Sequence, residues 1–163
     1  MHSRIFQISK ETIDVSDYIE ASDIPEGFQS GIADYVVDVE DRTAELKCLM
    51  ESFGGIFVPE PGEDSFRIAP NGKKAYFSGG YKRFRELCAL MLTTTMEAFI
   101  GMEAGPEDKA LSFLMYELNE AYSSKYGYYI YEDEELQPLP EWLRAADPQA
   151  IYHIGNVLDY TLR

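Results

Sequence analysis

The stretch Tyr81–Gly101, YKRFRELCALMLTTTMEAFIG, decides the predicted fold. It contains six consecutive non-polar residues, from Leu87 to Leu92. The apolar side chains around this run keep helical spacing, at Phe84, Leu87, Cys88, Met91, Ala98 and Phe99. A helix that is apolar on nearly every side must be buried on nearly every side. Because charged residues and three threonines interrupt the stretch Tyr81–Gly101, we expect no membrane span and predict a central, buried core helix.

The length and composition are typical of one folded domain, which we expect to span residues 1–163. Apolar residues make up 45% of the chain and aromatic residues 13%, which argues against disorder. No apolar segment follows Met1, so we predict no signal peptide and a cytoplasmic location. Cys48 and Cys88 are expected to be reduced and buried. Without a CxxC or HxxxH pattern, we expect no metal and no cofactor.

The net charge of -15 is unevenly distributed along the chain. Residues 11–45 carry eleven acids and one base, and residues 127–147 carry six acids and one base. Direct binding of nucleic acid or of an anionic membrane is therefore disfavoured, whereas a basic protein partner is compatible with the charge. The sequence leaves homo-oligomerisation open.

The first half of the chain contains recognisable element signals. Ser3–Ser9 alternates and predicts a strand. Short helical turns are expected near Val15–Ala21 and Ser30–Val37, where Pro25 interrupts any long element. Asp41 is a helix cap ahead of apolar residues at helical spacing up to position 53.

Three apolar runs follow, at Ile56–Val58, Phe66–Ile68 and Ala75–Phe77. Asn71 and Gly72 separate the second run from the third, and Asn-Gly is a strong hairpin signal because both residues accept positive φ. These runs predict a three-stranded antiparallel meander.

After the central helix, Pro106 and the apolar stripe over Leu111–Tyr122 predict a second long helix, antiparallel to the first. Tyr128–Tyr131 predicts a strand and Pro140–Ala146 a short helix. Ile151–Leu158 keeps helical spacing, with a closing strand as the alternative. Together these elements predict an α+β fold. A small antiparallel sheet of about four or five strands would pack against helices around the central buried helix.

An acidic segment is the first candidate interaction site. From Glu11 to Glu26 an acid occurs at every third position. On a threefold extended helix such acids would form one row, about 9 Å apart, and could imitate the charge of a nucleic-acid backbone. The alternative is an ordinary solvated surface, because apolar residues are interleaved. The candidate interaction surface consists of Asp14, Asp17, Glu20, Asp23 and Glu26.

A second candidate is the glycine-rich segment before the central helix. A turn that leads into a helix N-terminus presents free N–H groups to an anion, and neighbouring cations would strengthen such a site. The alternative is that these cations pair with the chain's own acids. The candidate anion-binding residues are Ser78, Gly79, Gly80, Lys82, Arg83 and Arg85.

No motif in the sequence identifies an activity. No catalytic residue is assigned, because no Ser/His/Asp order, GxSxG or P-loop is present. The interpretation we favour is a non-catalytic, acidic protein-interaction protein. The first alternative is a nucleic-acid-mimicking inhibitor of a DNA- or RNA-binding enzyme, and the second is a small-anion binder or enzyme that uses the Ser78–Arg85 turn.

Overall fold

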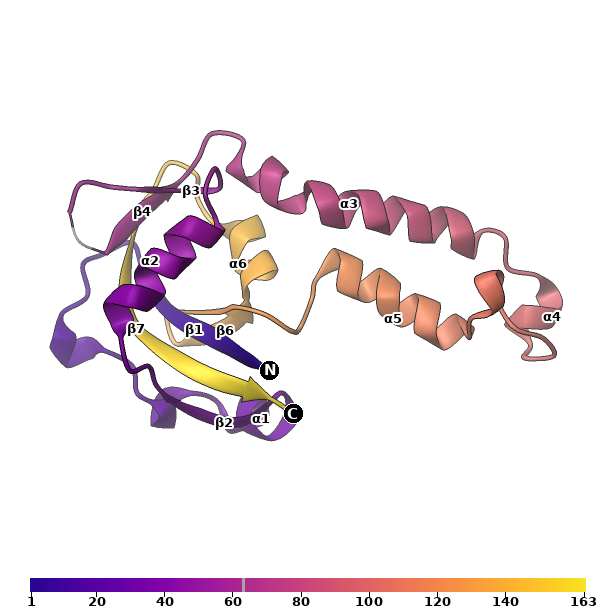
Figure 1. Ribbon diagram of the computed structural model, residues 1–163, viewed down its shortest axis with the longest axis horizontal. Coiled ribbons are helices and arrows are strands. Elements are labelled where there is room, and N and C mark those ends of the chain that lie inside the picture. The colour runs from indigo at the N-terminus through magenta and orange to yellow at the C-terminus, as the bar shows by residue number, and fades with distance from the viewer. Residues whose placement is uncertain (63) are drawn as a thin grey trace. The chain divides into compact units, whose positions relative to one another are not determined.

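A computed structural model describes residues 1–62 and 64–163 of the chain. The chain forms two compact units, both visible in Figure 1. Unit 1 comprises Met1–Ala75 and Tyr126–Arg163, and unit 2 comprises Tyr76–Lys125. Helices and an open sheet occur together, which confirms the α+β class.

Unit 1 is built on a mostly antiparallel sheet. Its strands are β1 (His2–Ser9), β2 (Ala33–Asp38), β3 (Phe57–Pro59), β4 (Ser65–Ile68), β5 (Tyr129–Glu132), β6 (Glu135–Pro138) and β7 (Ile151–Leu162). Across the described part of the chain, seven strands run in the order β3-β4-β7-β1-β5-β6, and β2 also pairs with β7. The pair β1–β5 is parallel, and the remaining pairs are antiparallel.

Strand β7 organises the sheet because it pairs with β1 along one edge and with both β4 and β2 along the other. The helix expected from Ile151 is therefore wrong, and the alternative of a closing strand is correct. The apolar residues of β7 have helical spacing in the sequence because the strand is buried on both faces and a bulge shifts its alternation. Between the pairs Phe6–Val157 and Ile8–Ile154, β7 has one residue more than β1.

One face of the sheet is covered by the segment that carries the predicted acids. This segment forms two 3₁₀ turns, η1 (Val15–Asp17) and η2 (Ala21–Asp23), followed by α1 (Glu26–Gly31). The Phe28 ring packs edge-to-face on Tyr129, with ring centroids 4.7 Å apart, and on Tyr160, with centroids 5.1 Å apart. The core on this face consists of Ile5, Ile19, Ile24, Phe28, Ala33, Val36, Tyr129, Leu158 and Tyr160.

The opposite face carries an aromatic core beneath α2 (Arg42–Ser52) and α6 (Leu139–Ala145). The Phe57 and Phe66 rings lie 4.7 Å apart, and the Trp142 and Tyr152 rings lie 5.0 Å apart. Trp142 is only 1% exposed. Since successive strand residues point to opposite faces, Ile5 and Phe6 supply the two separate cores.

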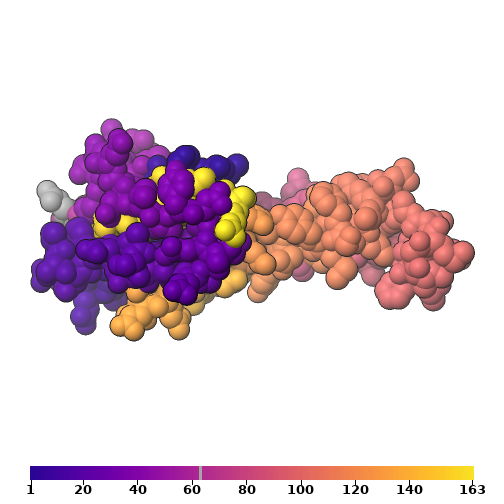
Figure 2. Space-filling model, turned by 90° about the horizontal axis from the view of Figure 1, so that it is seen from below, coloured from indigo at the N-terminus to yellow at the C-terminus, as the bar shows by residue number. Residues whose placement is uncertain are grey.

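In unit 2, α3 (Gly72–Met91, of which Tyr76 onward belongs to this unit) packs against α5 (Leu111–Tyr122). The short helix α4 (Met96–Phe99) and the 3₁₀ turn η3 (Pro106–Asp108) lie between them in sequence. The expected antiparallel helix pair is confirmed, because Gly80 meets the Ala121 carbonyl while Arg83 pairs with Glu117. In the space-filling view α5 lies over α3 (Figure 2).

The predicted third strand of the meander is wrong. Strands β3 and β4 form as expected, but Ala75–Phe77 lies within α3. Asn71 has the positive φ of 64° that the Asn-Gly signal suggested, yet it turns the chain from β4 into a helix. Gly72 starts α3 at a crowded position, where a Cβ would lie 2.7 Å from the Ile56 carbonyl oxygen.

The predicted central helix over Tyr81–Gly101 is also not confirmed. Helix α3 starts earlier and ends at Met91, so Leu92 lies beyond it, and within the apolar run Leu87–Leu92 only Leu87 is buried. Leu87 is fully buried, whereas Leu92 is 88% exposed. The threonines end the helix because their hydroxyls bond the backbone locally: Thr93 donates to the Leu90 carbonyl, and Thr95 accepts from the Ala98 N–H.

The remaining element predictions divide between right and wrong. The strand at Ser3–Ser9, the helix after Asp41, the strand at Tyr128–Tyr131 and the helix at Pro140–Ala146 are confirmed within a residue or two. The helical turn expected at Ser30–Val37 is wrong, because β2 occupies most of it. No helix among residues 1–62 and 64–163 is long and apolar enough to cross a membrane.

Candidate functional site

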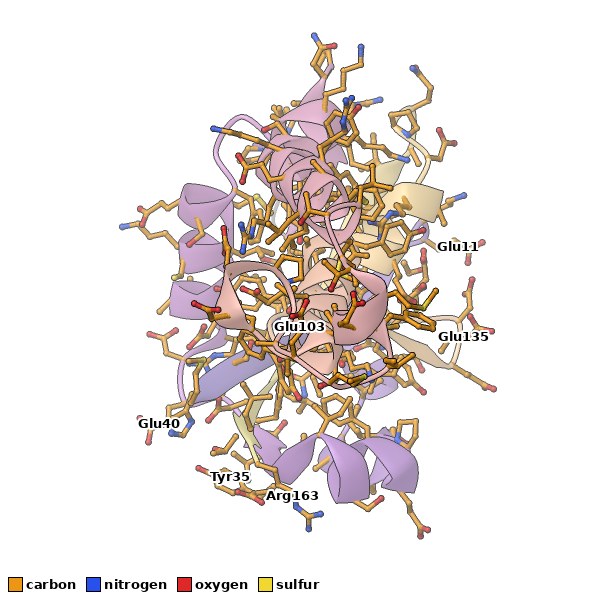
Figure 3. The ribbon with its side chains drawn as sticks, turned by 90° about the vertical axis from the view of Figure 1, so that its right-hand side faces the viewer. Glu11, Tyr35, Glu40, Glu103, Glu135 and Arg163 are labelled. Atoms are coloured by element: carbon orange, nitrogen blue, oxygen red, sulfur yellow. The ribbon has the colours of Figure 1, made fainter. Side chains whose placement is uncertain are left out.

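Two acidic segments that lie far apart in the sequence meet at one end of the sheet in unit 1. Glu11 follows β1, and Glu135 begins β6. Figure 3 shows both side chains on the same side of the molecule, with Glu40 on another side. The parallel pairing of β1 and β5 causes this meeting, since the carboxyl ends of parallel neighbours lie at the same end of a sheet.

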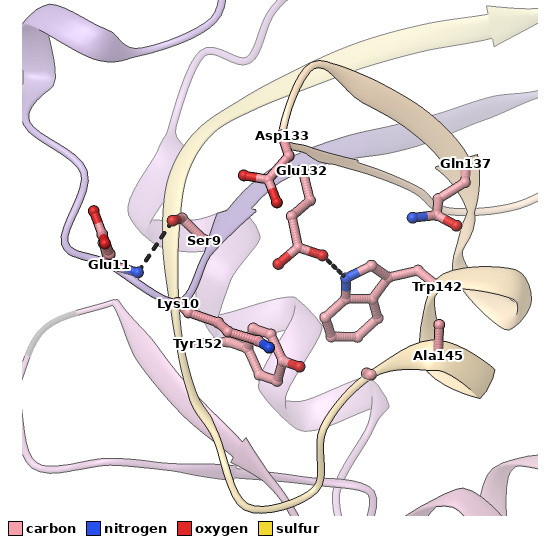
Figure 4. Close-up of a pocket in the computed structure, with 10 residues that line it drawn as sticks. Ser9, Lys10, Glu11, Glu132, Asp133, Gln137, Trp142, Ala145 and Tyr152 are labelled. Atoms are coloured by element: carbon pink, nitrogen blue, oxygen red, sulfur yellow. Dashed lines mark hydrogen bonds between the residues drawn. The ribbon is translucent and has the colours of Figure 1, made fainter.

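The first cavity at this end has a volume of about 430 Å³ (Figure 4). Glu132 accepts a hydrogen bond from the Trp142 indole N–H, at 2.8 Å, so a buried ring from the aromatic core fixes this carboxylate. The turn that follows has positive φ at Asp133 (51°) and Glu134 (65°), as a tight two-residue hairpin requires. The lining residues are Ser9, Lys10, Glu11, Glu132, Asp133, Gln137, Trp142, Ala145, Ala146 and Tyr152.

A second cavity of about 430 Å³ adjoins the first and shares Ser9, Glu11 and Asp133 with it. Its other lining residues come from β1, β5, the segment that contains the 3₁₀ turns, and the hairpin turn. They include Gln7, Asp17, Tyr18, Ile19, Asp23, Tyr131 and Glu134. We call the surface formed by these two cavities the acidic hollow.

Gln7 attaches the acidic segment to the sheet. Its amide oxygen accepts from the backbone N–H groups of Ile19 (3.1 Å) and Asn156 (3.0 Å), and its amide N–H donates to the Asp17 carbonyl (2.8 Å). Asn156 adds a bond to the Ile19 carbonyl, at 2.7 Å. Glycine in the β7 bulge leaves room for this anchor, because a Cβ on Gly155 would lie 2.4 Å from the Gln7 amide oxygen and the Gln7 side chain would have to move.

Arg42 hydrogen-bonds to the other edge of the bulge, at the point where β7 changes its partner from β4 to β2. Its guanidinium donates to the carbonyls of Ile154 (2.8 Å) and Gly155 (2.6 Å) and pairs with Asp64 at 2.8 Å. The guanidinium carbon also lies 5.2 Å from the centre of the Tyr18 ring. Arg42, the one base among residues 11–45, is therefore used inside the fold.

The acidic hollow is strongly negative. Its lining includes the base Lys10, whose charge opposes that of the acids. Burial raises the pKa of the Tyr131 hydroxyl, and the charges of Asp23 and Glu134 raise it further. The lining acids are Glu11, Asp17, Asp23, Glu132, Asp133 and Glu134. A cationic group is the chemistry that such a surface would accept.

All five residues of the predicted acidic surface, Asp14, Asp17, Glu20, Asp23 and Glu26, are exposed. They do not lie on one extended helix, because the segment is a chain of short turns. Their spacing follows from those turns: Asp14 and Glu20 are at N-caps, and Glu26 is in a first helical turn. Asp17 and Asp23 line the acidic hollow.

The predicted anion site loses its structural basis. Ser78, Gly79 and Gly80 lie inside α3, so the expected turn and helix N-terminus do not occur there. Instead, Gly80 permits close packing, because a Cβ there would lie 2.8 Å from the Ala121 carbonyl. Arg83 pairs with Glu86 and Glu117, and Arg85 bonds the Tyr81 hydroxyl. Lys82, also within α3, is exposed.

Neither the cysteines nor the potential metal ligands of the described residues form a further site. Cys48 is exposed rather than buried, and Cys88 is half-buried; both are free thiols. Within the described ranges, 1–62 and 64–163, no group of three or more His, Cys, Asp or Glu residues is placed to hold a metal ion.

Comparisons with known proteins add no relationship. No family model matches the chain, and neither the curated proteins nor the solved structures include a significant match.

Proposed function

We propose that this chain is a non-catalytic interaction protein whose acidic hollow receives a basic segment of another protein. One observation carries the proposal: acids from two distant segments converge on two adjoining cavities at the end of the β1–β5 pair. Both acidic segments thus contribute to one concave surface, where an extended chain with arginine or lysine side chains could bind. Charge at such a surface mainly accelerates encounter and makes binding depend on salt.

A direct test uses a labelled, flexible peptide of alternating arginine and serine, about ten residues long, which has no apolar face. The site variant is the triple substitution Glu11→Gln, Asp133→Asn and Glu134→Gln, which keeps shape and removes three charges. Each exposed ion pair contributes roughly 0.2–1 kcal/mol. At low salt we therefore expect the affinity to fall by about tenfold, and less at high salt.

The matched control removes three exposed charges elsewhere in unit 1, with Asp34→Asn, Glu40→Gln and Glu51→Gln. Its affinity should change by less than about twofold, since screening weakens charges beyond about 10 Å. Equal losses in the site variant and the control would mean that only overall charge attracts the peptide, and the proposal would fail.

The nucleic-acid mimic is the alternative function, and an inhibition assay tests it separately. A mimic would rely on the exposed acids of the acidic segment, so Asp14→Asn, Glu20→Gln and Glu26→Gln would weaken binding of the enzyme most. A DNA-binding enzyme that is inhibited by the wild-type chain, and not by this variant, would replace the present proposal with mimicry.

A further inference from the structure

The region of unit 2 around α4 exposes a concentrated set of large apolar side chains. Met96, Phe99 and Ile100 are at i, i+3 and i+4, so they share one helical face; they are 68%, 75% and 58% exposed. Leu92 (88%) and Met102 (75%) flank them. In Figure 2 the atoms of this region gather at one end of unit 2. We call these five residues the tip patch.

The backbone beneath the tip patch is held by specific hydrogen bonds. Thr95 caps α4 by accepting from the Ala98 N–H at 3.0 Å, and its hydroxyl donates to the Glu103 carboxylate at 2.6 Å. The Met102 N–H donates to the Glu97 carbonyl at 2.8 Å. The apolar side chains are therefore presented on an ordered scaffold. Concentrated apolar exposure of this kind marks an interaction site on a folded protein.

The charge around the tip patch identifies the kind of partner. Residues 92–108 contain four acids and no lysine or arginine. Glu107 pairs with Lys109 at 3.6 Å. In the part of the chain that the structure describes, Glu97, Glu103 and Asp108 take part in no ion pair, and all three are exposed. The surface thus combines exposed apolar groups with uncompensated negative charge.

We propose that the tip patch binds a basic amphipathic helix of another protein. The apolar face of such a helix would cover the five side chains, and its lysines or arginines would face the acids around them. Two of the five are methionines, whose flexible thioethers adapt to varied apolar partners. A second copy of the chain would bring like charges together, and an anionic membrane would repel them, so complementarity favours the basic helix over both.

This surface is distinct from the acidic hollow. It lies in unit 2, and it requires an apolar face on its partner, which the acidic hollow does not. The two proposals are therefore tested with different peptides, one without and one with an apolar face, and either proposal can fail while the other holds.

The test uses a labelled helical peptide of leucine and lysine, about five turns long, with all leucines on one face. The variant Phe99→Ser with Ile100→Ser should bind it roughly tenfold more weakly, since each large side chain loses most of its apolar contact. Glu97→Gln with Asp108→Asn keeps the apolar groups and the Thr95–Glu103 bond, and should weaken binding several-fold, mainly at low salt. This second variant also covers the case in which the serine variant is poorly folded.

Two controls make the result specific. Tyr35→Ser with Val37→Ser removes two apolar side chains, each 44% exposed, from unit 1, and should leave peptide affinity unchanged. A scrambled peptide of the same composition lacks an apolar face and should bind the wild type more weakly than the amphipathic peptide does. Its affinity should be the same for the wild type and for the variant Phe99→Ser with Ile100→Ser. Equal binding of the amphipathic peptide to the wild type and both tip variants would overturn the proposal. The proposal would also be overturned if the wild type self-associated, or bound anionic vesicles, and the tip variants lost that property without any change in their affinity for the peptide.

Discussion

Replacing Gln7 by leucine should loosen the acidic segment without changing any charge. The substitution removes three hydrogen bonds, to Asp17, Ile19 and Asn156. The Asp17 carbonyl lies at the surface and can bond water instead, whereas the two N–H groups are partly buried. Leaving a buried donor unsatisfied costs about 1–3 kcal/mol. Because this burial is incomplete, we expect a total loss of about 2–3 kcal/mol in the free energy of unfolding of unit 1.

The single tryptophan, Trp142, lies in the core of unit 1, so its fluorescence in a urea titration reports on that unit. For a chain of this size the expected loss corresponds to a melting temperature lower by about 5–10 °C. Amide exchange should accelerate at Ile19 and Asn156 in particular. Gln149→Leu, at an exposed glutamine, is the matched control and should have little effect. If Gln7→Leu and Gln149→Leu unfold at the same urea concentration, Gln7 does not anchor the segment.

Three further predictions test the fold. Gly155→Ala should destabilise unit 1 by about 1–3 kcal/mol in urea unfolding, because its Cβ would lie 2.4 Å from the Gln7 amide oxygen; wild-type stability would refute that contact. Burial raises the pKa of the Tyr160 hydroxyl above its ordinary value of 10.0, so folding favours the protonated form. The stability from this shift is present below pH 10 and is lost as pH rises through the folded pKa, and Tyr160→Phe should flatten that decline in thermal melts. Leu87→Asp, at a fully buried position, should cost about 3 kcal/mol or more by circular dichroism melting, whereas Leu92→Asp, at an 88% exposed position just beyond α3, should cost little; equal effects would contradict the burial of Leu87.

Elements with strong local signals were predictable from the sequence. Asp41 caps α2 through the Ala44 N–H, as the residue type and the following apolar spacing indicated. The strand at Tyr128–Tyr131 and the helix around Trp142 also follow from local composition. These elements form where the pattern places them because neighbouring residues supply most of the hydrogen bonds and contacts involved.

Elements whose state depends on distant partners were not predictable in the same way. Asn71 adopts the left-handed conformation in either a hairpin or a strand-to-helix turn, so its residue type does not decide between them. Strand β7 has apolar residues on both faces because it lies in the middle of the sheet, and the resulting spacing resembles that of a helix. Both errors arose from signals that describe only the local backbone.

For the candidate site, the sequence alone determined that two segments are rich in acids and that Asp17 and Asp23 belong to one of them. Only the tertiary structure decided that these acids share a surface with Glu132 and Glu134, because the parallel pairing of β1 with β5 brings together residues more than a hundred positions apart. Charge is carried by each residue wherever the chain places it, whereas a concave surface exists only after distant strands have paired.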